Sequence, residues 1–312
     1  MEARYRPEQI DLGRYLFFDP RLSGDGTQSC ASCHQPDKGF SDGLPRSIGA
    51  GQRELKRGAP SLWNIGFQHL LMWDGRSESL QAQARLPLFS EEEMNTTPEQ
   101  LEGRINAIAA YRPLFAQAFS SVGGRPITTE HIAQALAAFQ SSLVSLNSRY
   151  DRYVHSSQNA LNEQEIRGLK LFRSFDTRCS QCHTPPLFTN QQLAVTGTPE
   201  PEGLPFDRGA GPVFDEPTLL GAFKIPSLRN VAQSAPYMHS GVFADLKAVV
   251  GFYAKGRGNA APVGVDLKIH WHIVNPALNA QDQRDLVAFL KTLNDGTAMP
   301  VEPDLSQVML YP

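Results

Sequence analysis

A five-residue pattern occurs twice in this chain and uses all four of its cysteines. Cys30-Ala31-Ser32-Cys33-His34 comes first, and Cys179-Ser180-Gln181-Cys182-His183 follows 149 residues later. Two cysteines separated by two residues and followed by histidine are typical of c-type haem attachment, in which both thiols bind one porphyrin and the histidine ligates its iron. The sequence therefore predicts two covalently attached haems, one in each half.

Zinc binding or dithiol redox chemistry could also use cysteines at this spacing. One structural zinc ion could take two Cys-x-x-Cys pairs, but the histidine that directly follows each pair would then have no role. His34 and His183 therefore favour the haem interpretation.

Length and charge limit the class of protein. A chain of 312 residues is long enough for two domains, and we predict cytochrome c-like domains at 1–157 and 158–312. A net charge of -3 offers no basic stripe for nucleic acid, and no apolar run approaches the length of a membrane span. Because c-type haem is attached outside the bacterial cytoplasm, we expect a periplasmic protein whose signal peptide was removed or replaced.

Apolar residues at helical spacing predict a mainly α fold. The predicted helices cover residues 7–18, 101–119, 129–154, 245–255 and 280–293, together with a helix that Asn162 caps before the second haem motif. The segment 129–154 is predicted to be the longest. With 25 glycines and 23 prolines, we expect long loops and little strand. The pattern Gly-x-x-Leu-Phe precedes both haem motifs, at Gly13 and Gly168, which indicates an internal duplication.

Four further motifs resemble the bacterial dihaem cytochrome c peroxidase and MauG superfamily, in the same order along nearly the whole chain. They are Met72-Trp73-Asp74-Gly75-Arg76, Glu92-Glu93-Met94-Asn95, Pro226-Ser227-Leu228-Arg229-Asn230 and Ala235-Pro236-Tyr237-Met238-His239-Ser240-Gly241. The resemblance implies an enzyme that uses hydrogen peroxide, carries two haems and acts with a protein substrate or redox partner.

The resemblance also suggests the branch of the superfamily. Tyr253, 14 residues after His239, stands where the peroxidases place an axial methionine and where MauG-like enzymes have tyrosine. A phenolate is a hard anionic ligand, and we expect it to stabilise higher oxidation states of the haem on His183. Packing of the Tyr253 ring in the core is the alternative.

The haem on His34 is the expected peroxide site. Relatives usually carry a blocking histidine in the loop that matches residues 47–51, whereas Ala50 offers no ligand, so this haem should be open without prior reduction. The resemblance implies that Gln83, Pro87 and Glu93 lie beside it, with Glu93 as general acid and base. Glu91 and Glu92 are interpreted as solvated.

Other residues take roles that the resemblance implies. Trp73 matches a tryptophan between the two haems, although a packing role in the core would look the same. Relatives bind calcium partly through carbonyls that match Ser234 and Pro236, but Gly58 replaces an expected asparagine ligand. His239 is expected near the second haem. His270 and His272 receive no catalytic role.

Three functions remain open. The leading prediction is a MauG-like enzyme in which peroxide forms a bis-Fe(IV) state that oxidises tryptophan in a partner protein through long-range electron transfer. Thr177 stands where MauG has its exit tryptophan, so another aromatic residue such as Trp271 would pass the charge, or the partner differs. The alternatives are a cytochrome c peroxidase, which receives electrons from a small redox protein, and a non-catalytic dihaem electron carrier.

Overall fold

The computed structural model describes residues 5–155, 157–259, 264–297 and 299–306. The described part is mainly helical with little strand, as predicted, and its strands form one small sheet. Its helices are α1 (Pro7–Phe18), α2 (Cys30–Cys33), α3 (Leu80–Phe89), α4 (Pro98–Ala107), α5 (Tyr111–Ala118), α6 (Thr129–Ser142), α7 (Arg149–Val154), α8 (Glu163–Arg173), α9 (Cys179–Cys182), α10 (Gly211–Phe214), α11 (Leu246–Lys255) and α12 (Ala280–Lys291), and its strands are β1 (Leu193–Val195) and β2 (Ala222–Lys224).

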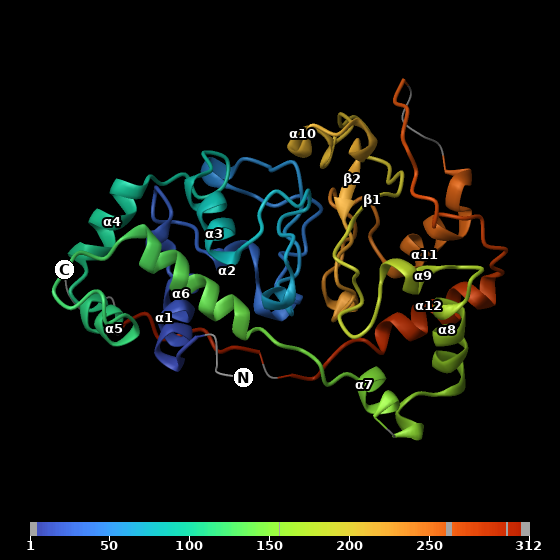
Figure 1. Cartoon of the computed structure of the whole chain (residues 1–312), viewed down its shortest axis with the longest axis horizontal. Coiled ribbons are helices and arrows are strands. Elements are labelled where there is room, and N and C mark those ends of the chain that lie inside the picture. Colours follow the sequence, from blue (N-terminus) through green and yellow to red (C-terminus); the bar gives the residue numbers. More distant parts are fainter. Residues whose placement is uncertain (1–4, 156, 260–263, 298, 307–312) are drawn as a thin grey trace.

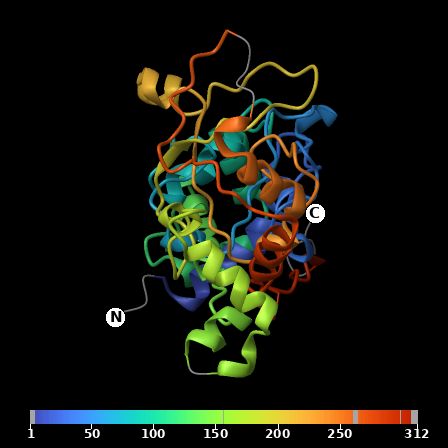
Figure 2. The ribbon, with the colours of Figure 1, turned by 90° about the vertical axis from the view of Figure 1, so that its right-hand side faces the viewer.

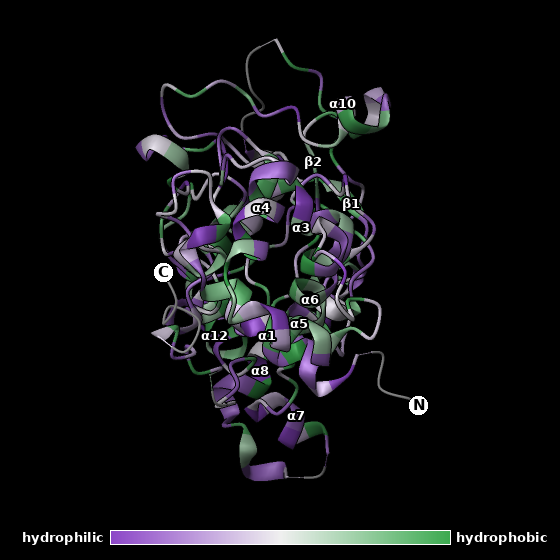
Figure 3. Ribbon diagram, turned by 90° about the vertical axis from the view of Figure 1, so that its left-hand side faces the viewer, coloured by the Kyte–Doolittle hydropathy of each residue, from purple (hydrophilic) through white to green (hydrophobic). Residues whose placement is uncertain are grey.

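The helices form two groups, with the sheet between them (Figure 1). In the N-terminal group α1 packs against α6, and in the C-terminal group α8 packs against α12. Each group has its own cluster of buried hydrophobic side chains. Strands β1 and β2 pair antiparallel, with Leu193 opposite Lys224. Seen from the N-terminal group, the helices carry both hydrophobic and hydrophilic residues (Figure 3), as amphipathic helices around a core should.

The two helix pairs repeat the same contacts. A side chain at Gly13 would collide with the backbone of Ala135, and one at Gly168 would collide with the backbone of Asp285. One turn further along, Phe17 meets Phe139 with ring centroids 5.0 Å apart, and Phe172 meets Phe289 at 5.1 Å. The repeated Gly-x-x-Leu-Phe pattern thus places a close helix crossing and an aromatic contact beside each haem motif, in agreement with a duplication.

Predicted helix starts are confirmed where the sequence supplies a capping side chain. Asn162, Asp245 and Asn279 each accept a hydrogen bond from a backbone N–H in the first turn of α8, α11 and α12. These caps satisfy N–H groups that would otherwise lack a partner.

Two predicted helices are wrong in length. Residues 108–110 form a turn that divides 101–119 into α4 and α5. The segment 129–154 is also divided, because the Asn64 side chain donates to the Ser145 carbonyl and accepts from the Ser145 amide, both at 2.9 Å. These bonds hold the chain extended after α6, and Ser148 then caps α7. At 14 residues α6 is still the longest helix of the described part.

After α12 the described chain, up to residue 306, returns to the N-terminal group (Figure 1). Met299 and Leu305 pack against the N-terminal hydrophobic cluster, and the Arg14 guanidinium donates to the Val301 carbonyl at 2.9 Å. The division at 157/158 stays a prediction, and this tail spans both groups. In Figure 2 the segment around α7, which links the groups, projects from one end of the molecule. No helix within the described ranges has the length and apolarity needed to cross a membrane.

Candidate dihaem active site

The first haem site consists of Cys30, Cys33 and His34. The two cysteines form the ends of α2, and the Nδ1 of His34 lies 2.9 Å from the Phe40 carbonyl oxygen. Since a carbonyl oxygen only accepts, Nδ1 carries the proton and Nε2 keeps its lone pair for a metal. Burial lowers the pKa of His34, which keeps the imidazole neutral and able to ligate iron.

The second haem site, formed by Cys179, Cys182 and His183, repeats this geometry. The His183 Nδ1 lies 3.0 Å from the carbonyl oxygen of Phe188, and burial lowers its pKa as well. Phe40 and Phe188 both adopt positive φ, 61° and 55°, which turns their carbonyls back towards the preceding histidine. Each histidine is thus fixed in one tautomer by the turn that follows it.

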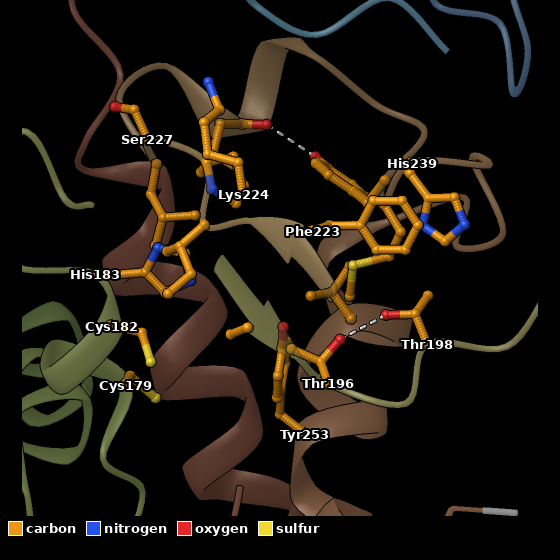
Figure 4. A pocket seen from close by; sticks show the side chains of 18 of the residues that line it. Cys179, Cys182, His183, Thr196, Thr198, Phe223, Lys224, Ser227, His239 and Tyr253 are labelled. Atoms are coloured by element: carbon orange, nitrogen blue, oxygen red, sulfur yellow. Dashed lines mark hydrogen bonds between the residues drawn. The ribbon is translucent and has the colours of Figure 1, made fainter. Parts of the chain in front are cut away.

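The donor sets fit two c-type haems. All four cysteines are free of disulfides, and burial raises the pKa of Cys30 to about 12 and that of Cys179 to about 11. At the second site the cysteines and His183 border a cavity with a largely apolar lining (Figure 4). A porphyrin bound there would be attached through thioethers to Cys179 and Cys182, with its iron on His183.

Tyr253 enters the cavity of the second haem site from α11 (Figure 4). Burial and the nearby sulfurs of Cys182 and Cys179 raise the pKa of Tyr253. The phenol is therefore neutral unless a cation lies beside it, and a ferric ion would supply that charge. The helix position predicted from the sequence brings this hydroxyl to the same cavity as His183.

The predicted peroxide-side residues lie on α3 and the turn after it. Gln83 Nε2 is 3.6 Å from Met72 Sδ, and the Pro87 carbonyl accepts from the amide of Met94 at 3.1 Å, which fixes the turn that holds Glu93. Burial raises the pKa of Glu93, while Arg76 opposes the shift. Burial, and after it the carboxylates of Asp42 and Glu93, raise the pKa of Cys33, in keeping with a Glu93 carboxylate near the first haem site.

Two acidic residues precede Glu93 on the same turn, and the loop that carries Ala50 is bonded to this turn. Glu91 and Glu92 are exposed, in agreement with their interpretation as solvated. The Ala50 amide donates to the carbonyls of Glu92 and Glu93, at 3.1 and 2.8 Å. The loop is therefore held against the turn by backbone bonds, and the methyl side chain of Ala50 cannot bind iron.

Trp73 lies where the two groups of helices meet. Its carbonyl accepts from the Lys224 amide at 2.7 Å, and its indole Nε1 donates to the Gly58 carbonyl at 2.8 Å. Trp73 also borders the cavity of the second haem site. Trp73 thus contacts the N-terminal group through its indole and the C-terminal group through its backbone, a position that suits a bridge between haems.

Ser234 and Pro236, the predicted calcium ligands, border the same cavity. The Gly58 carbonyl is occupied by the Trp73 indole. The calcium ion stays a prediction.

Sequence reasoning missed several charged residues around Trp73. Arg57 pairs with Asp74 at 2.6 Å within its own half and with Asp207 at 2.7 Å across the interface. Lys224 donates from Nζ to the Gln68 side chain at 2.6 Å, and burial lowers its pKa to about 8. Partners some 150 positions apart leave no local pattern in a sequence, so only the fold shows them.

His239, expected near the second haem, is confirmed as a neighbour of its cavity. Its Nε2 lies 2.9 Å from Glu200 Oε1, and its ring stacks on Phe223 with centroids 3.8 Å apart. His272 lies beside the second haem site, with Nδ1 4.0 Å from the sulfur of Cys182. His270 packs on His272, with ring centroids 5.0 Å apart.

Comparisons with known proteins agree with this site. The family model for di-haem cytochrome c peroxidase matches residues 7–159. Methylamine utilization protein MauG from Methylorubrum extorquens is 38% identical over 96% of this chain and 82% of its own length. The chain belongs to the di-haem cytochrome c peroxidase and MauG family.

Other members are similar over comparable lengths. Cytochrome c551 peroxidase of Pseudomonas aeruginosa is 34% identical, over 94% of this chain and 81% of that protein. A crystal structure of a MauG-like protein associated with microbial copper homeostasis superposes with a TM-score of 0.87 at 34% identity, covering 96% of this chain and 93% of that one. The protein is therefore a haem-dependent oxidoreductase that acts with peroxide, and membership of the family implies two c-type haems.

Proposed function

We propose that this di-haem enzyme uses hydrogen peroxide to oxidise tryptophan in a partner protein, in the manner of the MauG branch. The bound haems would supply the iron that reduces peroxide and holds its two oxidising equivalents. The observation that carries the proposal is Tyr253, which shares a cavity with His183. A phenolate opposite that histidine would favour the storage of oxidising equivalents rather than rapid electron donation. Relatives named MauG, 38% and 36% identical, support this assignment.

Glu93 is the proposed acid and base at the first haem site. To break the O–O bond, its carboxylate would take a proton from the near oxygen of peroxide and deliver it to the far one. Partial burial suits this role because it brings the pKa closer to neutral. Gln83 would orient the peroxide, and Pro87 would shape the pocket. Ala50 would leave the iron accessible before any reduction.

Trp73 is proposed to carry charge between the two haems. The indole bond to Gly58 holds the ring in place, and the backbone bond with Lys224 holds the residue at the interface. A rigid position lowers the structural rearrangement that a change of charge on the indole requires.

The test is to add one equivalent of peroxide to the fully oxidised protein without reductant. We expect the protein to keep two oxidising equivalents for minutes, measured by titration with ascorbate, and to pass them to a tryptophan-containing protein. Need for prior reduction, together with rapid turnover of reduced cytochrome c, would overturn the proposal. That result would instead support a cytochrome c peroxidase, the function in the name of the 34% identical relative.

Two further parts of the proposal concern location and metal content. Covalent haem attachment supports a periplasmic location. A calcium ion bound in part by the carbonyls of Ser234 and Pro236 would stabilise the interface between the groups of helices. Removal of calcium with a chelator should then lower the unfolding temperature, and readdition should restore it.

A further inference from the structure

Two large aromatic side chains are exposed next to the second haem site. Phe175 is 82% exposed and Trp271 is 66% exposed. Arg178 joins them: its guanidinium carbon lies 5.7 Å from the centre of the Trp271 ring, and its Nε donates to the Phe175 carbonyl at 3.2 Å. We call Phe175, Arg178 and Trp271 the aromatic patch. Exposed rings of this size add little to the core, and grouped on one surface they are typical of interaction sites.

The aromatic patch is in contact with the second haem site. The Trp271 ring packs on His272 with centroids 3.7 Å apart, and His272 Nδ1 lies 4.0 Å from the sulfur of Cys182. A continuous series of contacts therefore leads from solvent, through two aromatic rings, to a sulfur that would be bonded to haem. Electron transfer becomes steeply slower with distance, so a short path through packed rings is a favourable route.

The loop that carries Trp271 is held firmly. Arg257 donates to the carbonyls of Ile269, His270 and Ile273, at 3.1, 3.2 and 2.8 Å. The His272 amide donates to His270 Nδ1 at 3.2 Å. The exposed ring is thus presented on a braced turn, which reduces the conformational entropy that this loop loses when a partner binds.

The charges around the patch indicate the kind of partner. Two guanidinium groups lie at this surface: that of Arg178 lies over the Trp271 ring, and that of Arg257 is bonded to the carbonyls of Ile269 and His270. A partner with acidic residues around its contact would complement it and would be guided to it at low ionic strength.

We propose that the aromatic patch docks an acidic partner protein and that Trp271 passes electrons from a tryptophan of that protein to the second haem through His272. The inference rests on the proposed function. In each transfer Trp271 gives one electron inward and is restored by one electron from the partner. Two transfers and two protons reduce one hydrogen peroxide to two waters, and the partner is oxidised by two electrons.

A metal site is the competing interpretation of the same residues. Nitrogen atoms of His270 and His272 lie within 4.8 Å of one another and of the Cys182 sulfur. As a thioether, Cys182 would lose its thiolate and become a weak ligand. Two histidines would then remain, too few for a closed zinc site.

The test uses the holoenzyme, fully oxidised at the start, with a small acidic cytochrome c, reduced beforehand, as a surrogate for the partner protein that donates electrons. We expect Trp271→Phe to slow oxidation of this cytochrome at least tenfold, while the diferric protein still consumes its first equivalent of peroxide. Arg178→Glu should raise KM for the acidic cytochrome and leave kcat largely unchanged. Phe214→Ala is the matched control, because Phe214 is also exposed but lies on α10.

A second readout does not depend on turnover. With peroxide and no donor, oxidation should appear on Trp271 in peptide mass spectra and be absent from Trp63, which is 3% exposed. Wild-type kinetics in Trp271→Phe, or oxidation at another residue only, would overturn the proposal. Binding of stoichiometric Zn²⁺ that requires His270 and His272 would favour the metal site. If the wild-type protein retains no oxidising equivalents at all, the proposed function itself fails.

Discussion

Trp73 and His239 bind opposite ends of one residue, Gly58. The Trp73 indole donates to the Gly58 carbonyl at 2.8 Å, and the Gly58 amide donates to the His239 carbonyl at 2.9 Å. Trp73 and His239 are 166 positions apart in the sequence and each follows a methionine with positive φ, Met72 at 66° and Met238 at 71°. Equivalent positions of the two halves therefore both bond to the backbone of one residue, Gly58.

We expect Gly58→Ala to destabilise the protein. The new methyl carbon would lie 2.9 Å from the Pro45 carbonyl oxygen, closer than packed atoms tolerate. Overpacking of this kind costs about 1–3 kcal/mol. Urea unfolding measures the loss. Gly103→Ala is the control, since no atom lies within 4 Å of its added carbon and alanine favours a helix. Equal urea midpoints for the two variants would show that a side chain at position 58 does not collide with Pro45.

Tyr253→Phe should change the absorption and electron paramagnetic resonance spectra of the second haem and leave those of the first unaltered. The reason is loss of the proposed phenolate ligand. Tyr237→Phe is the matched control, because Tyr237 borders the same cavity and its hydroxyl donates to the Val231 carbonyl at 3.0 Å. That variant should lose about 1 kcal/mol of stability and keep its spectra. Unaltered second-haem spectra in Tyr253→Phe would show that Tyr253 is not a ligand.

Glu93→Gln should slow the reaction with peroxide about 10²- to 10⁴-fold, because an amide cannot move the proton. In the wild-type protein the pKa of Glu93 is raised above its ordinary value of 4.5, chiefly by burial. The rate should therefore fall as pH drops through this raised pKa, at a higher pH than for a solvated glutamate. Stopped-flow measurements against pH follow both effects. Glu92→Gln, a change at an exposed carboxylate, should leave rate and profile unaltered.

The raised pKa of Glu93 also predicts that Glu93→Gln stabilises the protein at neutral pH. A carboxyl whose pKa is raised on folding binds more protons in the folded state, so its contribution falls as pH rises from 4.5 through the folded pKa. Above that pKa the buried charge is fully destabilising. Glu93→Gln should thus raise the unfolding temperature at neutral pH while it slows the reaction. Loss of both stability and rate would point to a structural role.

Much of the fold could be predicted because local chemistry determines it. Asn162 and Asn279 cap helices with their own side chains, and Cys-x-x-Cys-His requires a short turn with histidine at its end. The division of the segment 129–154 could not be predicted, because the bonds that end α6 come from Asn64, far away in sequence. The Arg57–Asp207 ion pair was missed for the same reason. The roles of the Cys-x-x-Cys-His residues were predicted from the motif itself, whereas the roles of Tyr253 and Glu93 depended on the family resemblance.

Gly168→Ala tests the duplicated helix crossing. The added carbon would lie 2.0 Å from the Asp285 carbonyl oxygen and 2.8 Å from the Phe289 side chain, so α8 and α12 would have to separate. Because the ring of Phe172 contacts that of Phe289, separation would also loosen the core next to Cys179. We expect the free energy of unfolding to fall by about 1–3 kcal/mol or more. Gly251→Ala, also in a helix but with no atom within 4 Å, should instead gain about 0.5–1 kcal/mol. Thermal unfolding of both variants measures the difference, and a stabilised Gly168→Ala would show that the two helices do not cross this closely.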